Sequence, residues 1–211
     1  MGPTESSAVN SRRGSSIVPL VTDDDEALVA RARAGDRAAF DDLVRRHADG
    51  LYAVVARLCA GRDEAEEVTQ EAFLRAWRGL PSFRGDARFF TWLYRIGVNE
   101  ARRRADGRRR RADVVVMSLD EQREHASRDR WVQPVDRAER ADLRCTLDAA
   151  IAGLPVDQRA ALVLRDVDGL STAEAAAVLG LGEAAFKSRL HRARELLRAR
   201  LADHATQRGA S

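Results

Sequence analysis

Residues 171–194 read STAEAAAVLGLGEAAFKSRLHRAR, and this stretch decides the fold of the C-terminal part of the chain. Ser171 is followed three residues later by Glu174, which is the pattern of a capping box at the start of a helix. Gly180 then interrupts the helical pattern, and a second, more basic helix follows. A short helix, a glycine turn and a basic helix in this order predict a helix-turn-helix.

The second helix of this pair carries polar side chains at spacings of three and four residues, which places them on one face. These candidate DNA-reading residues are Lys187, Ser188, His191 and Arg192. Lysine and arginine can read guanine edges in the major groove, and serine can contact several bases. The alternative is an amphipathic helix whose basic face is merely solvated.

The rest of the chain has the periodicity of helices, and no β-strand is predicted. We expect an all-α protein of two small helical domains joined by a flexible linker. The expected divisions are a disordered N-terminal tail (1–22), a first domain (23–112), the linker (113–135), a second domain (136–202) and a C-terminal tail (203–211). In the first domain, Asp36, Asp63 and Asp86 are expected to cap the second, third and fourth helices, and the fourth is expected to run toward Arg104.

Composition narrows the possible functions. The chain has 211 residues, which is too short for a multi-domain enzyme. Its 36 basic and 33 acidic side chains give a net charge of +3. Cys59 and Cys145 lie far apart without a metal-ligand spacing, so both are predicted to be small core residues in a reducing compartment. The apolar cluster 17–21 is too short for a signal peptide or a spanning helix. We therefore expect a cytoplasmic protein without membrane insertion.

The fourth helix of the first domain combines aromatic and basic residues. Five of the eleven aromatic residues lie within positions 83–94, and runs of arginine follow at 102–104 and 108–111. Basic charge beside aromatic rings is typical of proteins that bind unstacked single-stranded bases. Phe89 and Trp92 share the apolar face of this helix, so Phe90 and Tyr94 are expected to be the exposed rings.

The third helix begins with a dense acidic segment at residues 63–71. Acidic residues at a helix start complement the macrodipole, but such a surface could equally dock a protein partner. The four histidines are scattered, and no phosphate loop or nucleophile with a nearby base is found. We therefore predict no catalytic activity, no metal and no cofactor.

These segments together resemble a known family. Residues 63–77, 83–86, 90–96 and 98–99 resemble region two of the extracytoplasmic-function (ECF) RNA polymerase sigma factors of the sigma-70 family. Residues 154–155, 168–171 and 187–194 resemble region four. The stretch Gly182 to Phe186 departs from the usual Pro-x-Gly-Thr-Val pattern before the recognition helix.

The resemblance implies an alternative sigma factor that directs bacterial RNA polymerase to promoters. It implies docking on the core enzyme through Asp63, Glu66, Glu67 and Gln70. It implies capture of the melted minus-10 element through Phe83, Phe90, Tyr94, Asn99, Arg102 and Arg103, with 83–89 as the loop that holds a flipped base. Region four would read the minus-35 element, and an anti-sigma factor is an expected partner. A free-standing helix-turn-helix regulator and an RNA-binding adaptor remain alternatives, although neither requires residues 63–99.

Overall fold

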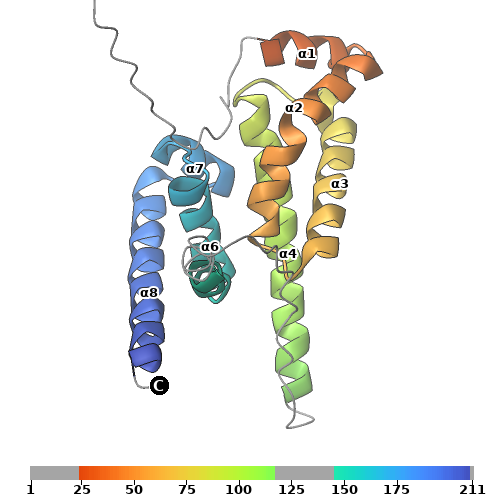
Figure 1. Cartoon of the computed structure of the whole chain (residues 1–211). Helices are drawn as coiled ribbons and strands as arrows, with labels where there is room; N and C mark the ends of the chain where they lie inside the picture. The colour runs from red at the N-terminus through yellow and green to blue at the C-terminus, as the bar shows by residue number, and fades with distance from the viewer. Residues whose placement is uncertain (1–23, 117–144, 210–211) are drawn as a thin grey trace, which may run out of the picture.

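The computed structural model describes residues 24–116 and 145–209, and every regular element in these two ranges is a helix. The expected tail at 1–22 lies outside the described residues, as do the expected linker from residue 117 onward and residues 136–144. Two helical blocks lie side by side, with the first containing α1 to α4 and the second α6 to α8 (Figure 1). The prediction of an all-α protein with two helical domains is confirmed.

The first block contains α1 (Asp24–Arg33), α2 (Arg37–Ala56), α3 (Arg62–Gly79), the short 3₁₀ helix η1 (Leu80–Ser82) and α4 (Phe89–Val116). Asp36 caps α2, since its carboxylate accepts a hydrogen bond from the backbone nitrogen of Ala39 at 3.2 Å. His47 of α2 is buried, and its Nε2 lies 2.8 Å from Asp25 of α1. Burial lowers the pKa of His47 even though Asp25 opposes this shift.

Two helices of the first block differ from their expected bounds. The N-cap of α3 is Gly61, so Asp63 lies within the first turn and is not the cap. The fourth helix begins at Phe89 and runs to Val116, beyond Arg104 and past the expected domain boundary at 112. Arginine and alanine are good helix formers, and the pairing of Arg108 with Glu64 of α3 holds the added turns in place.

The second block begins with a helical segment at 145–152, followed by α6 (Val156–Leu162), a widened turn η2 (Val163–Val167), α7 (Thr172–Leu179) and α8 (Glu183–Gly209). The capping box is confirmed: the Glu174 nitrogen donates to Ser171 Oγ, and the Ser171 nitrogen donates to Glu174 Oε2. Gly180 ends α7 in the left-handed conformation, with φ of 66°. The backbone of α8 continues through residue 209, into the expected tail at 203–211.

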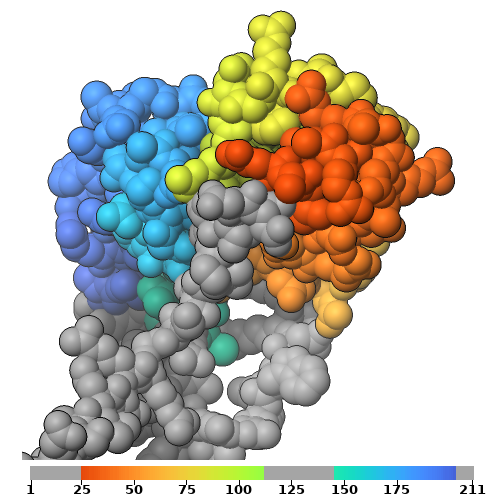
Figure 2. All heavy atoms as spheres, turned by 90° about the horizontal axis from the view of Figure 1, so that it is seen from above, coloured from red at the N-terminus to blue at the C-terminus, as the bar shows by residue number. Residues whose placement is uncertain are grey.

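One continuous apolar core runs through both blocks. Leu43, Leu51 and Val55 of α2 are fully buried in the first block, as are Val163 and Phe186 in the second. Seen from above, the loop before α4 lies against the second block (Figure 2). Cys59 is buried as expected, but the prediction for Cys145 is wrong, because its thiol is exposed. A small side chain on the outer side of a short helix carries no periodic signal that would reveal this.

Candidate functional site

The exposed face of α8 carries all four residues that the sequence suggested for reading DNA. Lys187, Ser188, His191 and Arg192 are exposed. Phe186, Leu190 and Ala193 point into the core and fix the rotation of the helix about its axis. Arg194 also holds α8 against η2 through two hydrogen bonds to Asp166, of 2.9 and 2.7 Å. A polar face on a rigid, well-anchored helix is suited to insertion into a major groove.

The polar groups of α4 fall on two different faces. Asn99, Arg102 and Arg95 lie on one face, since they are separated by three to four residues. Asn99 is exposed, and its Oδ1 lies 3.5 Å from Arg102 Nη1. Arg103 lies beside this face and is two-thirds exposed. An amide with both donor and acceptor atoms beside guanidinium groups can read a base and bind the backbone next to it.

The aromatic residues are arranged differently from the expectation. Phe90 and Tyr94 are each only 1% exposed, so the prediction that they are the exposed rings of α4 is wrong. Their rings meet edge to face at 5.9 Å. Burial raises the pKa of the Tyr94 hydroxyl well above its ordinary value, with the Asp168 carboxylate adding to the shift. The helix is covered on more sides than its own apolar stripe indicates.

Phe83 is also buried, although it lies in the loop between η1 and α4. Its ring packs against Trp92 at 4.9 Å and against Phe89 at 6.4 Å. Residues 84–88 of this loop are exposed. The aromatic cluster therefore packs beneath the loop, and the exposed residues 84–88 form the solvent-facing surface there.

The acidic helix α3 has one continuous exposed row. Asp63, Glu67 and Gln70 are exposed along it, and Leu74 continues the row with half of its surface accessible. Glu66 is exposed beside this row and pairs with Arg62 at 2.8 Å. Sequence reasoning missed Leu74. Its position four residues after Gln70, away from the buried Phe73, was the signal that could have revealed it.

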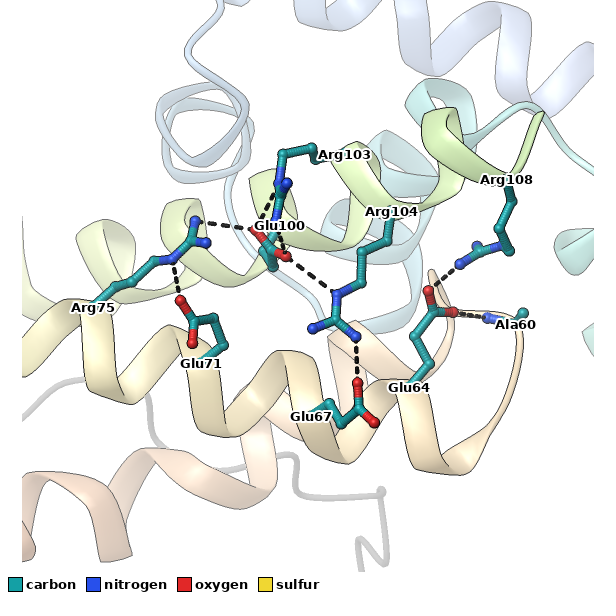
Figure 3. Close-up of polar contacts among 9 residues, drawn as sticks. All are labelled: Ala60, Glu64, Glu67, Glu71, Arg75, Glu100, Arg103, Arg104 and Arg108. Atoms are coloured by element: carbon teal, nitrogen blue, oxygen red, sulfur yellow. Dashed lines mark hydrogen bonds and ion pairs between the residues drawn. The ribbon is translucent and has the colours of Figure 1, made fainter. Parts of the chain in front are cut away.

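A charge cluster between α3 and α4 fixes the relative position of these two surfaces (Figure 3). Glu100 is 2% exposed and lies at its centre. Its carboxylate accepts hydrogen bonds from Arg103 at 2.6 and 3.0 Å and from Arg104 at 3.2 Å, and it pairs with Arg75 at 3.0 Å. The bonds from Arg103 and Arg104 and the charge of Arg75 hold the pKa of Glu100 below its usual value, although burial opposes the shift.

The same cluster includes two pairs near the start of α3. Arg104 donates to Glu67 at 2.7 Å, and Arg108 pairs with Glu64. Glu67 is therefore bonded to α4 as well as exposed. In the described residues 24–116 and 145–209, no group of three or more histidine, cysteine, aspartate or glutamate side chains could hold a metal ion. No helix within these ranges has the length and apolar content needed to cross a membrane.

Comparison with known proteins identifies the two blocks. Residues 43–111 match the family model described as Sigma-70 region 2, and residues 146–197 match the model described as Sigma-70, region 4. The RNA polymerase sigma-H factor of Pseudomonas aeruginosa is 38% identical over 185 residues, which cover 84% of this chain and 94% of that protein. The ECF RNA polymerase sigma-E factor of Escherichia coli is 38% identical over 176 residues, which cover 82% of this chain and 92% of that protein.

Two solved structures are similar to most of this chain in fold. CnrH in complex with the cytosolic domain of CnrY gives a TM-score of 0.61 at 30% identity, covering 86% of this chain and 99% of CnrH. The sigma factor RpoE of Bartonella quintana, in complex with the anti-sigma factor NepR, gives 0.58 at 27% identity, covering 77% and 96% of the two chains. The chain belongs to the sigma-70 family, in its ECF subfamily. We refer below to α1–α4 as region two and to residues 145–209 as region four.

Proposed function

We propose that this protein is the promoter-selecting subunit of a bacterial RNA polymerase, an alternative sigma factor that reads the minus-35 element and captures the melted minus-10 element. The observation that carries the proposal is the presence of both regions on one chain, in order, each with an exposed polar surface. The two alternatives, a free-standing regulator and an RNA adaptor, do not account for the match of residues 43–111 to Sigma-70 region 2.

Recognition of the minus-35 element is assigned to the exposed face of α8. Lys187 and Arg192 are the base-reading or phosphate-binding groups, and Ser188 and His191 set the register. Ser188 Oγ donates to the Ala184 carbonyl at 3.1 Å, which orients the hydroxyl, and Lys187 lies 3.7 Å from Glu183. This exposed pair is weak, so it can exchange for a contact with DNA at little cost.

Capture of the minus-10 element is assigned to Asn99, Arg102, Arg103 and the exposed loop 84–88. The buried rings of Phe83, Phe90 and Tyr94 support this surface from inside. They position the loop and α4, and they do not themselves stack on bases in the arrangement seen here. Unstacking a base costs a few kcal/mol, so the loop must supply a pocket or hydrogen bonds that offset about this amount.

Docking to the polymerase core is assigned to the exposed row of α3. Asp63, Glu66, Glu67 and Gln70 supply the polar contacts, and Leu74 supplies an apolar centre, as at many protein interfaces. An anti-sigma factor is proposed as a second partner, because the similar Bartonella sigma factor was solved with one.

The test is transcription in vitro with core RNA polymerase and genomic DNA fragments, with the 5′ ends of the transcripts sequenced to find the promoters. We expect transcripts only when both the protein and the core enzyme are present. On a promoter found in this way, Asn99→Ala should reduce base preference on duplex DNA and on a template with a pre-melted minus-10 bubble. Specific binding to duplex DNA by the protein alone, without a gain from polymerase, would contradict the proposal.

A further inference from the structure

Arg103 of α4 is an exposed arginine that is held by a buried carboxylate. Two-thirds of its side chain is accessible to solvent, whereas Glu100 beside it is buried. Arg103 donates from Nε and Nη2 to the two carboxylate oxygens of Glu100, at 3.0 and 2.6 Å (Figure 3). A pair with two such bonds fixes the plane of the guanidinium as well as its position.

The Glu100 carboxylate is itself held from two helices. Arg75 of α3 pairs with its Oε2 at 3.0 Å, and Arg104 of α4 donates to its Oε1 at 3.2 Å. Arg104 is tied to α3 in turn, because it donates to Glu67 at 2.7 Å. The position of the carboxylate is therefore set by the packing of α4 on α3 and does not depend on what binds at the surface. The exposed Arg103 has a rigid anchor in the interior.

Arg103 also lies at the edge of the proposed minus-10 surface. It follows Asn99 by four residues, and side chains at this spacing are neighbours on a helix, with Cβ atoms about 5–6 Å apart. The pair with Glu100 occupies the edge of the guanidinium that contains Nε. A guanidinium has a second edge, formed by Nη1 and Nη2, with the fork geometry that matches a phosphate. One arginine can therefore bind Glu100 along one edge and a phosphate along the other.

We propose that Glu100 is a positioning residue for DNA binding, which presents Arg103 to the phosphate beside the base that Asn99 reads. Because Glu100 already orders the arginine side chain, little conformational freedom is lost when the phosphate binds. This inference rests on the proposed function for the identity of the DNA and for the role of Asn99. The orientation of Arg103 by Glu100 is a property of region two alone, so the two ideas can fail separately.

Positioning and simple charge repulsion predict opposite effects of removing the Glu100 charge. DNA is a polyanion, so neutralising a nearby carboxylate removes repulsion and should strengthen binding. Positioning predicts weaker binding by Glu100→Gln, because a neutral amide offers one acceptor oxygen in place of two charged ones and no longer holds both guanidinium nitrogens. The sign of the change therefore distinguishes a positioning carboxylate from one that only repels DNA.

The first measurement is the affinity of the full chain for a fluorescent ten-nucleotide oligothymidine, which needs no promoter. Glu100→Gln should bind it roughly two- to tenfold more weakly than the unchanged protein, the range expected for the ordering of one long side chain. The control is Asp106→Asn, the same charge change at an exposed carboxylate of the same helix, which should bind at least as tightly as the unchanged protein. In an Arg103→Ala background, Glu100→Gln should cause no further loss, because the positioned group is gone.

A second variant keeps the test valid if Glu100→Gln does not fold, which circular dichroism will show. Arg103→Lys retains Glu100 and the positive charge, but an ammonium group cannot bind a carboxylate along one edge and a phosphate along another. It should also bind the oligothymidine roughly two- to tenfold more weakly. Wild-type affinity in Arg103→Lys would show that charge alone is enough and would overturn the proposal.

The second measurement is the salt dependence of the same binding, which a purely structural role of Glu100 would leave unchanged. Loss of one phosphate contact on a single strand lowers the slope of log K against log salt concentration by about 0.7. Glu100→Gln and Arg103→Ala should each show this decrease. An unchanged slope, or equal or tighter binding by Glu100→Gln, would overturn the positioning role. If the decrease is seen but the protein supports no promoter-dependent transcription with polymerase, the proposed function fails while the positioning role stands.

Discussion

Replacing Glu100 with glutamine is the sharpest test of how region two is held together. The substitution keeps the shape of the side chain but removes the charge that three arginines share. A hydrogen bond to a charged group contributes about 1.5–3 kcal/mol, and breaking a fully buried ion pair costs about 3–5 kcal/mol. Arg75, Arg103 and Arg104 are 43%, 66% and 27% exposed, so water can replace part of what they lose. We therefore expect a loss of about 2–3 kcal/mol in the free energy of unfolding.

The matched control is Glu66→Gln, the same chemical change on an exposed pair outside the Glu100 cluster. Glu66 accepts from Arg62 at 2.8 Å, four residues away on the surface of α3. Such pairs contribute about 0.3–0.5 kcal/mol. Urea denaturation followed by circular dichroism measures both variants. If Glu100→Gln lowers the unfolding midpoint no more than Glu66→Gln does, the cluster does not stabilise the packing of α4 on α3.

The effect of Glu100→Gln should also depend on pH. The pKa of Glu100 is held below the ordinary value of 4.5, so the folded state binds a proton less readily than the unfolded state does. The stabilisation by the charged carboxylate is thus fully present above pH 4.5 and is lost as the pH falls through the folded-state pKa. The difference between Glu100→Gln and the unchanged protein should shrink over that range. A difference that stays constant down to pH 3 would show that charge is not its origin.

Three further predictions address the polymerase, the DNA and the core. Gln70→Arg should weaken binding to core polymerase without changing helix content. It is a cleaner probe than Glu67→Arg, which also removes the partner of Arg104. Unchanged affinity in a pull-down titration would exclude α3 as the docking surface. The double variant Lys187→Ala, Arg192→Ala should lose about 1–3 kcal/mol of DNA-binding free energy for each base-reading contact removed, as measured by mobility shift on DNA with a minus-35 element. Unaltered minus-35 binding would refute the assignment. Gly50→Ala should lower stability by about 1–3 kcal/mol, because its new methyl group would collide with the buried Tyr94 hydroxyl. Gly107→Ala has open space around the new methyl group and should gain about 0.5–1 kcal/mol. Thermal unfolding that ranks the two variants the other way contradicts this packing.

The local features of the helix-turn-helix could be predicted because they depend on neighbours in the sequence. A serine three residues before a glutamate, and a glycine after the last apolar position, specify a helix start and a helix end with no reference to the rest of the chain. Both are present as expected at Ser171 and Gly180. The exposed face of α8 followed for the same reason, because Phe186 and Leu190 alone determine which side faces inward.

The surroundings of α4 could not be predicted in this way. The sequence of a helix reveals the stripe that faces its largest neighbour, but α4 packs against α2, α3 and region four on different sides. The burial of Tyr94 depends on Gly50 of α2 and on the block that contains Asp168, more than seventy residues away in the sequence. No spacing rule within 83–104 encodes these contacts. The length of α4 was missed for a related reason, since Glu64 stabilises its added turns from another helix.

The arginines of α4 also show how a modest net charge can coexist with strong binding surfaces. On one side of the helix, Arg104 and Arg108 bind carboxylates of α3 within region two. On the other side, Arg95 and Arg102 bind oxygens of region four, whose apolar core is continuous with that of region two. The first set of pairs lies within region two, whereas the second set joins the two regions. A single arginine-rich helix thereby binds carboxylates of its own region on one side and oxygens of region four on the other, so its runs of basic charge meet acidic partners while the net charge of the chain stays at +3.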